Sequence, residues 1–263
     1  MSVASAKVCP PAIVMCDVVA AASKNPGSQV AAAVEWTVNP GEFWVVAGAQ
    51  HSGKTDFLMM VGGLTAPTGG DYHFFGEPMP IFEETRLAKR LKLGFAFDGG
   101  QLLGQLTVAE NIALPLQYHL NLTPEDVAAR VGELLAFTEL EPWAKKSPGN
   151  MGRSWQQRAG LARALALAPE VLLVDSPLTG LDARHTRWWL EALDQLARGH
   201  ALRADKPLTL VVTADDLRPW HQHATHFACL TEQRLLVLGD WAAVTGSRER
   251  AVRDLLDAPP ARD

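Results

Sequence analysis

The chain has 263 residues, of which 48% are hydrophobic and 20% charged, and its net charge at pH 7 is −5. This length and composition predict one large or two small globular domains with an ample core. The acidic balance argues against nucleic acid as a partner, because binding nucleic-acid phosphates requires a basic face. We find no apolar stretch near the roughly 20 residues of a membrane span and no secretory signal, so we expect a cytoplasmic protein.

Strand and helix patterns alternate along most of the chain. Short apolar runs bounded by turn residues predict buried parallel strands at 43–47, 91–97, 171–174 and 208–213. Amphipathic stretches predict helices at 56–63, 107–120, 124–137, 155–167 and 184–198. This alternation favours an α/β fold in which helices cover a parallel sheet.

Residues 98–158 interrupt the alternation, because they hold helical patterns and no convincing strand. We therefore predict an inserted helical subdomain at 98–158 and a core formed by 1–97 and 159–245. A C-terminal tail, 246–263, follows, and we expect its segment Ala258–Ala261 to be frayed.

Residues 48–55 read GAQHSGKT, a Gly-x4-Gly-Lys-Thr phosphate loop between an apolar run and a helical pattern. In such a loop, backbone N–H groups converge on phosphates, the lysine supplies a positive charge and the threonine hydroxyl binds Mg²⁺. The predicted nucleotide-binding residues are Gly48, His51, Ser52, Gly53, Lys54 and Thr55. His51 could reach a terminal phosphate, although loop positions of this kind vary freely.

Further segments follow at characteristic distances. Residues 171–175 read VLLVD, a strand ending in an acid, so Asp175 joins Thr55 as a predicted Mg²⁺ ligand. Residues 155–165 (WQQRAGLARAL) precede it and 176–182 (SPLTGLD) follow. Together with the loop, these segments resemble the nucleotide-binding subunits of ABC transporters in order and spacing, from about residue 12 to about 245.

The resemblance implies a P-loop NTPase (RecA-like) core with a mostly parallel sheet and an inserted helical subdomain. It also implies ATP and Mg²⁺ as cofactors, an integral membrane permease as partner, and a peripheral location on the cytoplasmic side of the inner membrane. Residues 97–103 (FDGGQLL) and 111–116 (NIALPL) look like the ATPases of MCE-type (Mla-like) lipid transporters.

The resemblance further implies a head-to-tail dimer with a second ABC subunit, like or unlike, whose nucleotide faces a signature at a helix N-terminus. Here the signature reads Met151–Trp155, so Gly152, Arg153 and Ser154 occupy its interface positions, and Asp182 matches the D-loop. The side chains of Arg153 and Ser154 would crowd a backbone that must approach the terminal phosphate. Alternatively, Arg153 acts in trans as a cation near that phosphate.

Three catalytic positions implied by the resemblance are replaced. The general base that should follow the strand acid is Ser176, whose hydroxyl is not basic near pH 7. The switch histidine is Ala214, and the Q-loop glutamine aligns with Asp98. We therefore predict little or no hydrolysis at this chain's own site.

Other residues near the loop predict weak nucleotide binding. The adenine-stacking aromatic of the first strand is absent, with Ala20 at its position, and a base stack contributes about 1–3 kcal/mol. Asp56 puts a carboxylate near the α-phosphate, which it would repel. Asp215 and Asp216 follow the strand at 208–213 and could hold Mg²⁺, but capping is the simpler interpretation.

The leading hypothesis is a degenerate ABC-type subunit that binds ATP and Mg²⁺ weakly and serves a structural or regulatory role. The first rival is an active ATPase subunit that uses unorthodox catalytic residues. The second rival is a soluble pseudo-ATPase that works as a binding module outside transport.

Overall fold

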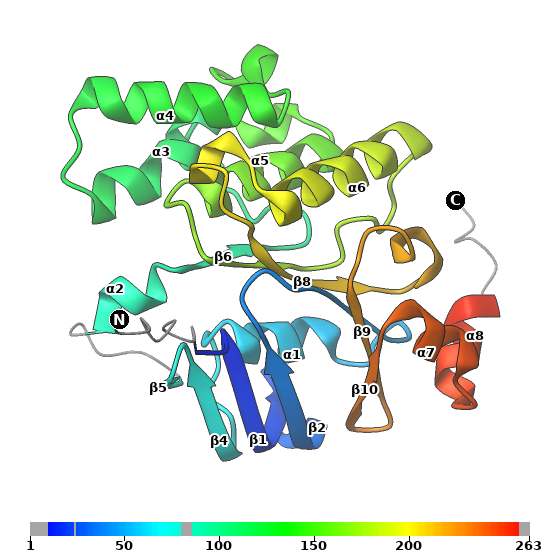
Figure 1. The fold of residues 1–263 in the computed structure, drawn as a ribbon. Coiled ribbons are helices and arrows are strands. Elements are labelled where there is room, and N and C mark those ends of the chain that lie inside the picture. Colours follow the sequence, from blue (N-terminus) through cyan, green and yellow to red (C-terminus); the bar gives the residue numbers. More distant parts are fainter. Residues whose placement is uncertain (1–9, 24, 80–85, 258–263) are drawn as a thin grey trace, which may run out of the picture.

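A six-stranded sheet forms the centre of the computed structural model, which describes residues 10–23, 25–79 and 86–257 (Figure 1). The sheet order is β10-β9-β3-β8-β7-β6, and all its neighbours run parallel except the antiparallel pair β9 and β10. Its strands are β3 (Phe43–Ala47), β6 (Leu93–Ala96), β7 (Val171–Val174), β8 (Thr209–Ala214), β9 (His226–Thr231) and β10 (Arg234–Gly239). The structure thus confirms the four predicted strands and the mostly parallel sheet.

A second, antiparallel sheet was not predicted. It has the order β2-β1-β4-β5 and consists of β1 (Ile13–Ala22), β2 (Asn25–Val38), β4 (Gly69–Phe74) and β5 (Glu77–Pro78). Alanine is depleted in strands, and alanine runs at 20–22 and 31–33 weaken the strand pattern of β1 and β2.

The helices between residues 108 and 198 lie on one side of the six-stranded sheet, at the top of Figure 1, and the helix that follows the phosphate loop lies on the other side. The α-helices are α1 (Lys54–Val61), α2 (Leu87–Arg90), α3 (Val108–His119), α4 (Pro124–Phe137), α5 (Arg153–Leu165), α6 (Ala183–Arg198), α7 (Trp241–Gly246) and α8 (Arg250–Asp257). Single 3-10 turns are η2 (Glu141–Trp143), η3 (Pro148–Asn150), η4 (Ala201–Arg203) and η5 (Arg218–Trp220). The five predicted helices are confirmed.

Local signals explain where the inserted helices begin. A capping box of Thr107 and Glu110 starts α3, and the hydroxyl of Thr123 caps α4. Residues 98–158, all of which the structure describes, contain no strand. The division predicted at residue 158 falls inside α5, which runs unbroken across it.

Two hydrophobic clusters pack against opposite faces of the sheet. Along β3, Phe43, Val45 and Ala47 belong to the cluster that contains residues of α3–α6. Trp44 and Val46 belong to the other, which contains α1 and the antiparallel sheet. Because side chains alternate along a strand, the fully buried β3 serves both clusters and fixes the position of the loop that follows it.

The C-terminal part contains a further helix that was not predicted. Val252 and Leu255 of α8 are buried, so residues 250–257 pack onto the core, while Ala258–Ala261 lie outside the described residues. Among the described residues, no helix has the length and apolarity needed to cross a membrane.

Candidate nucleotide-binding site

The carboxyl ends of the parallel strands bring the predicted site residues to one edge of the sheet. The register pairs Ala47 with Ala214, and the N–H of Gly48 donates to the carbonyl of Ala214 over 3.1 Å. The N–H of Asp175 donates to the carbonyl of Ala96 over 2.9 Å. The phosphate loop, the strand acid, the switch position and the start of the Q-loop therefore meet at this edge.

The loop backbone has the shape of a phosphate cradle. Gly53 has φ 88° and ψ 16°, a left-handed conformation that glycine adopts without strain, and α1 begins at the next residue. A Cβ on Gly48 would lie 2.6 Å from Ser52 Oγ and 2.8 Å from the carbonyl of Leu230, so glycine is required there as well. His51 is exposed at the rim of the loop. The cradle fits a chain of phosphates, since N–H groups at a helix N-terminus bind anions.

Lys54 is buried beneath the loop, where it is only 6% exposed. Its Nζ donates to the carbonyls of Gly48 (2.9 Å) and Ala49 (2.7 Å) and lies 2.7 Å from Asp215 Oδ1. The capping role predicted for Asp215 is therefore wrong, because its carboxylate contacts the loop lysine. Asp216 accepts from the N–H of Arg218, the first residue of η5, over 2.8 Å, but the N-cap residue of η5 is Leu217.

Asp175 is 3% exposed and bonded on both carboxylate oxygens. Thr55 Oγ1 donates to its Oδ2 over 2.8 Å, and Thr213 Oγ1 donates to its Oδ1 over 2.7 Å. Burial is the main cause that raises the pKa of Asp175, and the two threonine hydroxyls oppose it. Thr55 and Asp175 are thus placed together, as the predicted Mg²⁺ pair requires.

Around Asp175, the positions of the expected base and switch carry no basic side chain. Ser176 has φ 46°, and its N–H donates to Thr213 Oγ1 over 2.8 Å. Ala214 is buried and offers only a methyl group. Thr213, which joins the strand acid to the backbone after it, was missed because threonine in a strand carries no functional signal.

Asp98 and Arg153, two departures from the family pattern, form an ion pair with each other. Gln157 Nε2 also donates to Asp98 Oδ1 over 3.2 Å. Gly152 caps the N-terminus of α5, so the signature segment lies at a helix N-terminus as expected. Ser154 Oγ, one residue further into α5, lies 3.3 Å from Nε2 of His185.

One face of α5 binds the Q-loop segment along several turns. A Cβ on Gly100 would lie 2.1 Å from the carbonyl oxygen of Gln156, and one on Gly160 would lie 2.6 Å from the Cα of Gly100. Arg163 donates to the carbonyls of Gly100 and Gln101, each over 2.9 Å. The segment 98–101 and α5 are therefore in backbone-to-backbone contact.

His185 connects the signature segment to a buried cation. Its Nδ1 lies 3.1 Å from the guanidinium of Arg158, which is fully buried and stacks on Trp188 at 3.8 Å. Burial and the Arg158 charge lower the pKa of His185. Asp182 accepts from the N–H of His185 over 2.8 Å, which caps α6 and lowers the pKa of the Asp182 carboxyl.

The position assigned to the missing adenine-stacking residue is wrong. Ala20 is completely buried in the antiparallel sheet, so it cannot face a nucleotide base. Register shifts lie on both sides of Ala20, and each shift changes which residues face outward. Ser23, which follows β1, donates its N–H to Asp56 Oδ1 in the first turn of α1 over 3.1 Å.

These groups enclose a cavity of about 500 Å³. Its charged lining side chains are one lysine, Lys54, and three carboxylates, Asp56, Asp98 and Asp215. The remaining lining residues are Gln50, His51, Gly53, Thr55, Ser176 and Thr179. The site is thus a phosphate cradle whose walls carry more negative than positive charge.

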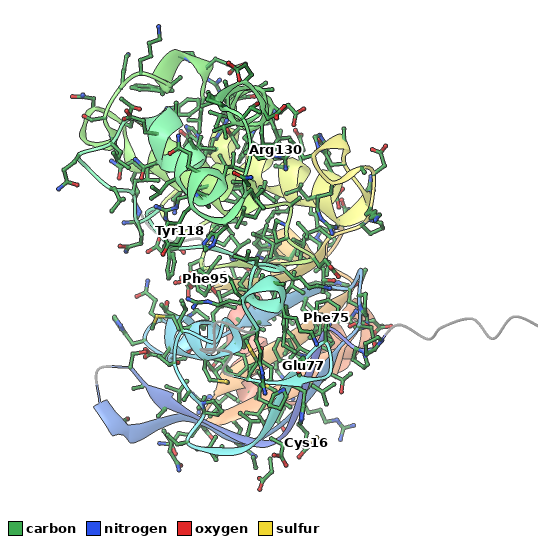
Figure 2. All side chains as sticks on the ribbon, turned by 90° about the vertical axis from the view of Figure 1, so that its left-hand side faces the viewer. Cys16, Phe75, Glu77, Phe95, Tyr118 and Arg130 are labelled. Atoms are coloured by element: carbon green, nitrogen blue, oxygen red, sulfur yellow. The ribbon has the colours of Figure 1, made fainter. Side chains whose placement is uncertain are left out.

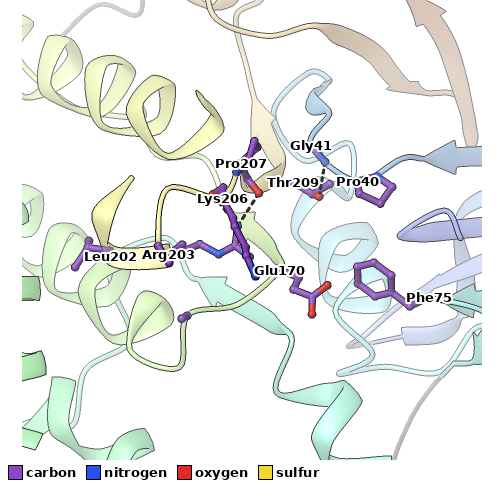
Figure 3. A pocket seen from close by; sticks show the side chains of 11 residues that line it. Pro40, Gly41, Phe75, Glu170, Leu202, Arg203, Lys206, Pro207 and Thr209 are labelled. Atoms are coloured by element: carbon purple, nitrogen blue, oxygen red, sulfur yellow. Dashed lines mark hydrogen bonds between the residues drawn. The ribbon is translucent and has the colours of Figure 1, made fainter. Parts of the chain in front are cut away.

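Another cavity, of about 590 Å³, lies at the amino ends of β3, β7 and β8, on the edge opposite the phosphate loop (Figure 3). The Phe75 ring forms one wall, and Lys92 lies 5.1 Å above that ring and 2.8 Å from Glu170. Arg203 donates to the carbonyls of Lys206 and Pro207. Because it lies on the opposite edge of the sheet, this cavity is separate from the nucleotide site.

A third cavity, of about 500 Å³, is mostly apolar, although His119 and Arg163 also line it, and it lies between the core and α3. Phe95, Phe97, Leu114 and Tyr118 line it, and Tyr118 is 81% exposed. Figure 2 looks onto this face and shows Tyr118 and Phe95 toward the viewer. An exposed aromatic beside an apolar hollow is typical of a protein contact.

Comparisons with known proteins agree with this geometry. The ABC transporter family model matches residues 31–179. An ABC transporter ATP-binding protein of Methanosarcina acetivorans is 32% identical over 231 residues, which are 84% of this chain and 78% of that protein. The macrolide export ATP-binding/permease protein MacB of Azoarcus sp. is 34% identical over 172 residues, 64% of this chain but 26% of MacB. The methionine import ATP-binding protein MetN 2 of Pseudomonas entomophila is 34% identical over 163 residues, 62% of this chain and 49% of MetN 2. The chain thus spans about a quarter of MacB and half of MetN 2.

Solved structures show the same fold. A dimeric, post-hydrolysis ATP-binding cassette, MJ0796 bound to ADP and Pi, has a TM-score of 0.74 at 27% identity over 85% of this chain and 96% of that one. For cbiO1 from Clostridium perfringens, part of the ABC transporter complex cbiONQ, the TM-score is 0.76 at 18% identity, covering 91% and 92%, and this likeness concerns the fold alone. With the phosphate loop, the strand acid and the helical N-terminus in the arrangement described above, this chain belongs to the ABC transporter family, as one of its ATP-binding domains.

Proposed function

We propose that this chain is a nucleotide-binding subunit of a membrane transport complex that does not hydrolyse ATP at its own site. The observation that carries the proposal is the pair Ser176 and Ala214 beside the buried Asp175. Neither side chain can accept a proton from an attacking water near pH 7. The subunit would then serve a structural or regulatory role.

The carboxylates that line the cavity support the same conclusion. Asp98 accepts from Arg153 and Gln157, Asp56 accepts from the backbone at Ser23, and Asp215 is paired with Lys54. A general base must lie within hydrogen-bond reach of the attacking water, and each of these three carboxylates has at least one oxygen held by another group, away from the position that follows Asp175. Thr55 and Asp175 would hold Mg²⁺ if nucleotide binds, and Mg²⁺ would neutralise phosphate charge there.

Residues 98–158 form, in this proposal, the helical subdomain that docks on an integral membrane permease at the cytoplasmic face of the inner membrane. The apolar cavity beside α3 supports this role, since exposed Tyr118 and Leu114 offer a surface for an apolar partner segment. A second ABC subunit, like or unlike, would complete a dimer. The resemblance of 97–103 and 111–116 to ATPases of MCE-type systems supports a lipid as cargo.

Phosphate release by the purified protein, alone and with its co-purified partners, tests the catalytic part. We expect no rate of phosphate release that depends on Lys54. Ser176→Glu supplies the missing carboxylate, and we expect this variant to gain ATPase activity. A robust rate in the natural protein that Lys54→Ala abolishes would contradict the proposal. It would favour the active rival, in which His51 or a cavity carboxylate replaces the base.

Affinity capture from solubilised membranes tests the docking part. We expect a permease and a second ABC subunit, identified by mass spectrometry, and we expect Tyr118→Glu to remove the permease. Val237→Glu is the matched control, because Val237 is also exposed (46%) but lies on β10, far from α3 in Figure 1. Equal capture by natural protein and Tyr118→Glu would argue against this surface. Capture without any membrane protein would favour the soluble binding module.

A further inference from the structure

The ammonium group of Lys54 has no N–H left for a ligand. An ammonium offers three donors and no acceptor. Two point at the carbonyls of Gly48 and Ala49, and the third position is taken by Asp215 Oδ1 at 2.7 Å. Because Lys54 is only 6% exposed, water cannot easily replace any of these partners. A phosphate oxygen that binds Lys54 must therefore displace one of them, and the carboxylate is the one that is not part of the loop backbone.

Asp215 lies on the side of the cavity where a terminal phosphate would reach. It follows Ala214, the last residue of β8, and Thr179 Oγ1 donates to its Oδ2 over 3.4 Å. Thr179 lies in the segment after Asp175, the side from which water and Mg²⁺ meet the last phosphate in enzymes with this loop. The deeper phosphates have a second set of partners, the loop N–H groups at the start of α1, and binding to these groups does not require Asp215 to leave Lys54.

Charge adds to this steric competition. Asp56 and Asp98 line the same cavity, and Lys54 is its one lining lysine or arginine within the described chain. A terminal phosphate brings additional negative charge and would come closest to Asp215, so it meets the strongest repulsion.

We propose that Asp215 is an internal competitor for the terminal phosphate, so that this site takes a nucleoside diphosphate more readily than the triphosphate. The inference rests on the proposed function, because it concerns occupancy of a site that does not turn its ligand over. Asp215 is thereby a ligand-selecting residue, and a diphosphate-bound state becomes the ordinary liganded state of the subunit.

Isothermal titration of the full chain with Mg-ADP and with Mg-β,γ-imido-ATP tests this. In the natural protein we expect the diphosphate to bind at least about fivefold more tightly. In Asp215→Asn, the triphosphate analogue should gain about tenfold or more, equivalent to about 1.4 kcal/mol, while the diphosphate changes less than about threefold. Asp215→Ala, which also removes the side-chain acceptor, should show the same selectivity and serves if the asparagine variant folds poorly.

Asp216→Asn is the matched control. It removes the same charge one residue along, from a carboxylate that lies 2.6 Å from Arg218 and is not bonded to Lys54. Both affinities should stay within about twofold of the natural protein. An unchanged affinity ratio in Asp215→Asn, an equal gain for both ligands, or no binding by the folded variant would overturn the proposal. Lys54-dependent phosphate release from ATP in the same samples would instead refute the proposed function and leave the affinity ratio as a separate result.

Discussion

Replacement of Gly100 by alanine measures how tightly the Q-loop segment is packed on α5. Gly99 and Gly100 both have left-handed backbones, with φ of 68° and 79°. A Cβ on Gly99 would meet its nearest atom, on Arg153, at 3.8 Å, whereas one on Gly100 would lie 2.1 Å from the carbonyl oxygen of Gln156. The two variants therefore share backbone strain, and Gly100→Ala alone adds a clash with the helix backbone.

The magnitudes follow from these two terms. Left-handed strain costs about 1–2 kcal/mol for a residue with a Cβ, so Gly99→Ala should lower the free energy of unfolding by that amount. Overpacking adds about 1–3 kcal/mol, so Gly100→Ala should lower it by about 2–5 kcal/mol. Gly160→Ala removes a glycine from a helix interior, which normally stabilises by about 1 kcal/mol. Here the new Cβ would lie 2.6 Å from the Cα of Gly100, so we expect Gly160→Ala to lower the free energy of unfolding.

Urea denaturation followed by circular dichroism gives these free energies by linear extrapolation, with the slope as a check on two-state behaviour. If Gly160→Ala stabilises the protein, or if Gly100→Ala costs no more than Gly99→Ala, the close contact between the segment and α5 does not exist as described.

Three further predictions concern buried charges. Asp175→Asn should raise the melting temperature at pH 7, by about 2–4 °C for each kcal/mol gained, because it removes a carboxylate whose pKa burial raises. A carboxyl whose pKa is raised in the folded state stabilises the fold at low pH, and this stabilisation is lost as pH rises through the raised pKa. The gain in melting temperature from Asp175→Asn should therefore be full above the raised pKa and vanish near pH 3. A gain that grows toward low pH would contradict the assignment. Arg158→Met should raise the pKa of His185, followed by NMR titration, because the nearby cation lowers that pKa; burial persists, so the pKa should stay below its usual range. Arg158→Lys should cost about 2 kcal/mol of unfolding free energy despite keeping the charge, since an ammonium cannot stack flat on Trp188; a loss below about 0.5 kcal/mol would show that the stack contributes little.

The sequence predicts the phosphate loop and its partner acid well because backbone geometry determines both. A glycine-rich turn between a buried strand and a helix has few conformations, and parallel strands bring their carboxyl ends to one edge. The backbone therefore brings four positions close to the loop irrespective of their side chains: Asp98, Asp175, Ser176 and Ala214. The pattern within single strands is less informative where alanine dominates, and β1 and β2 were missed for that reason.

Side-chain pairing could not be predicted in the same way. Asp215 and Asp216 are chemically identical neighbours, and the sequence does not show which of them turns toward Lys54. The pairing of Asp98 with Arg153 depends on the distance between two segments that are separated by two helices. The error at Ala20 arose in a strand whose register against β2 shifts four times, so that counting alternate residues fails.

The sheet order also constrains how the protein is made. The strand that carries the phosphate loop, β3, is hydrogen-bonded on one side to β8 and on the other to β9, and both lie in the last quarter of the chain. During synthesis β3 leaves the ribosome early, and it cannot pair with β8 and β9 until nearly the whole chain has been synthesised. Such non-local pairing slows folding and exposes aggregation-prone surface in the meantime. A nascent or truncated chain that ends before β8 contains the entire loop sequence and yet lacks both strands on which the loop is seated.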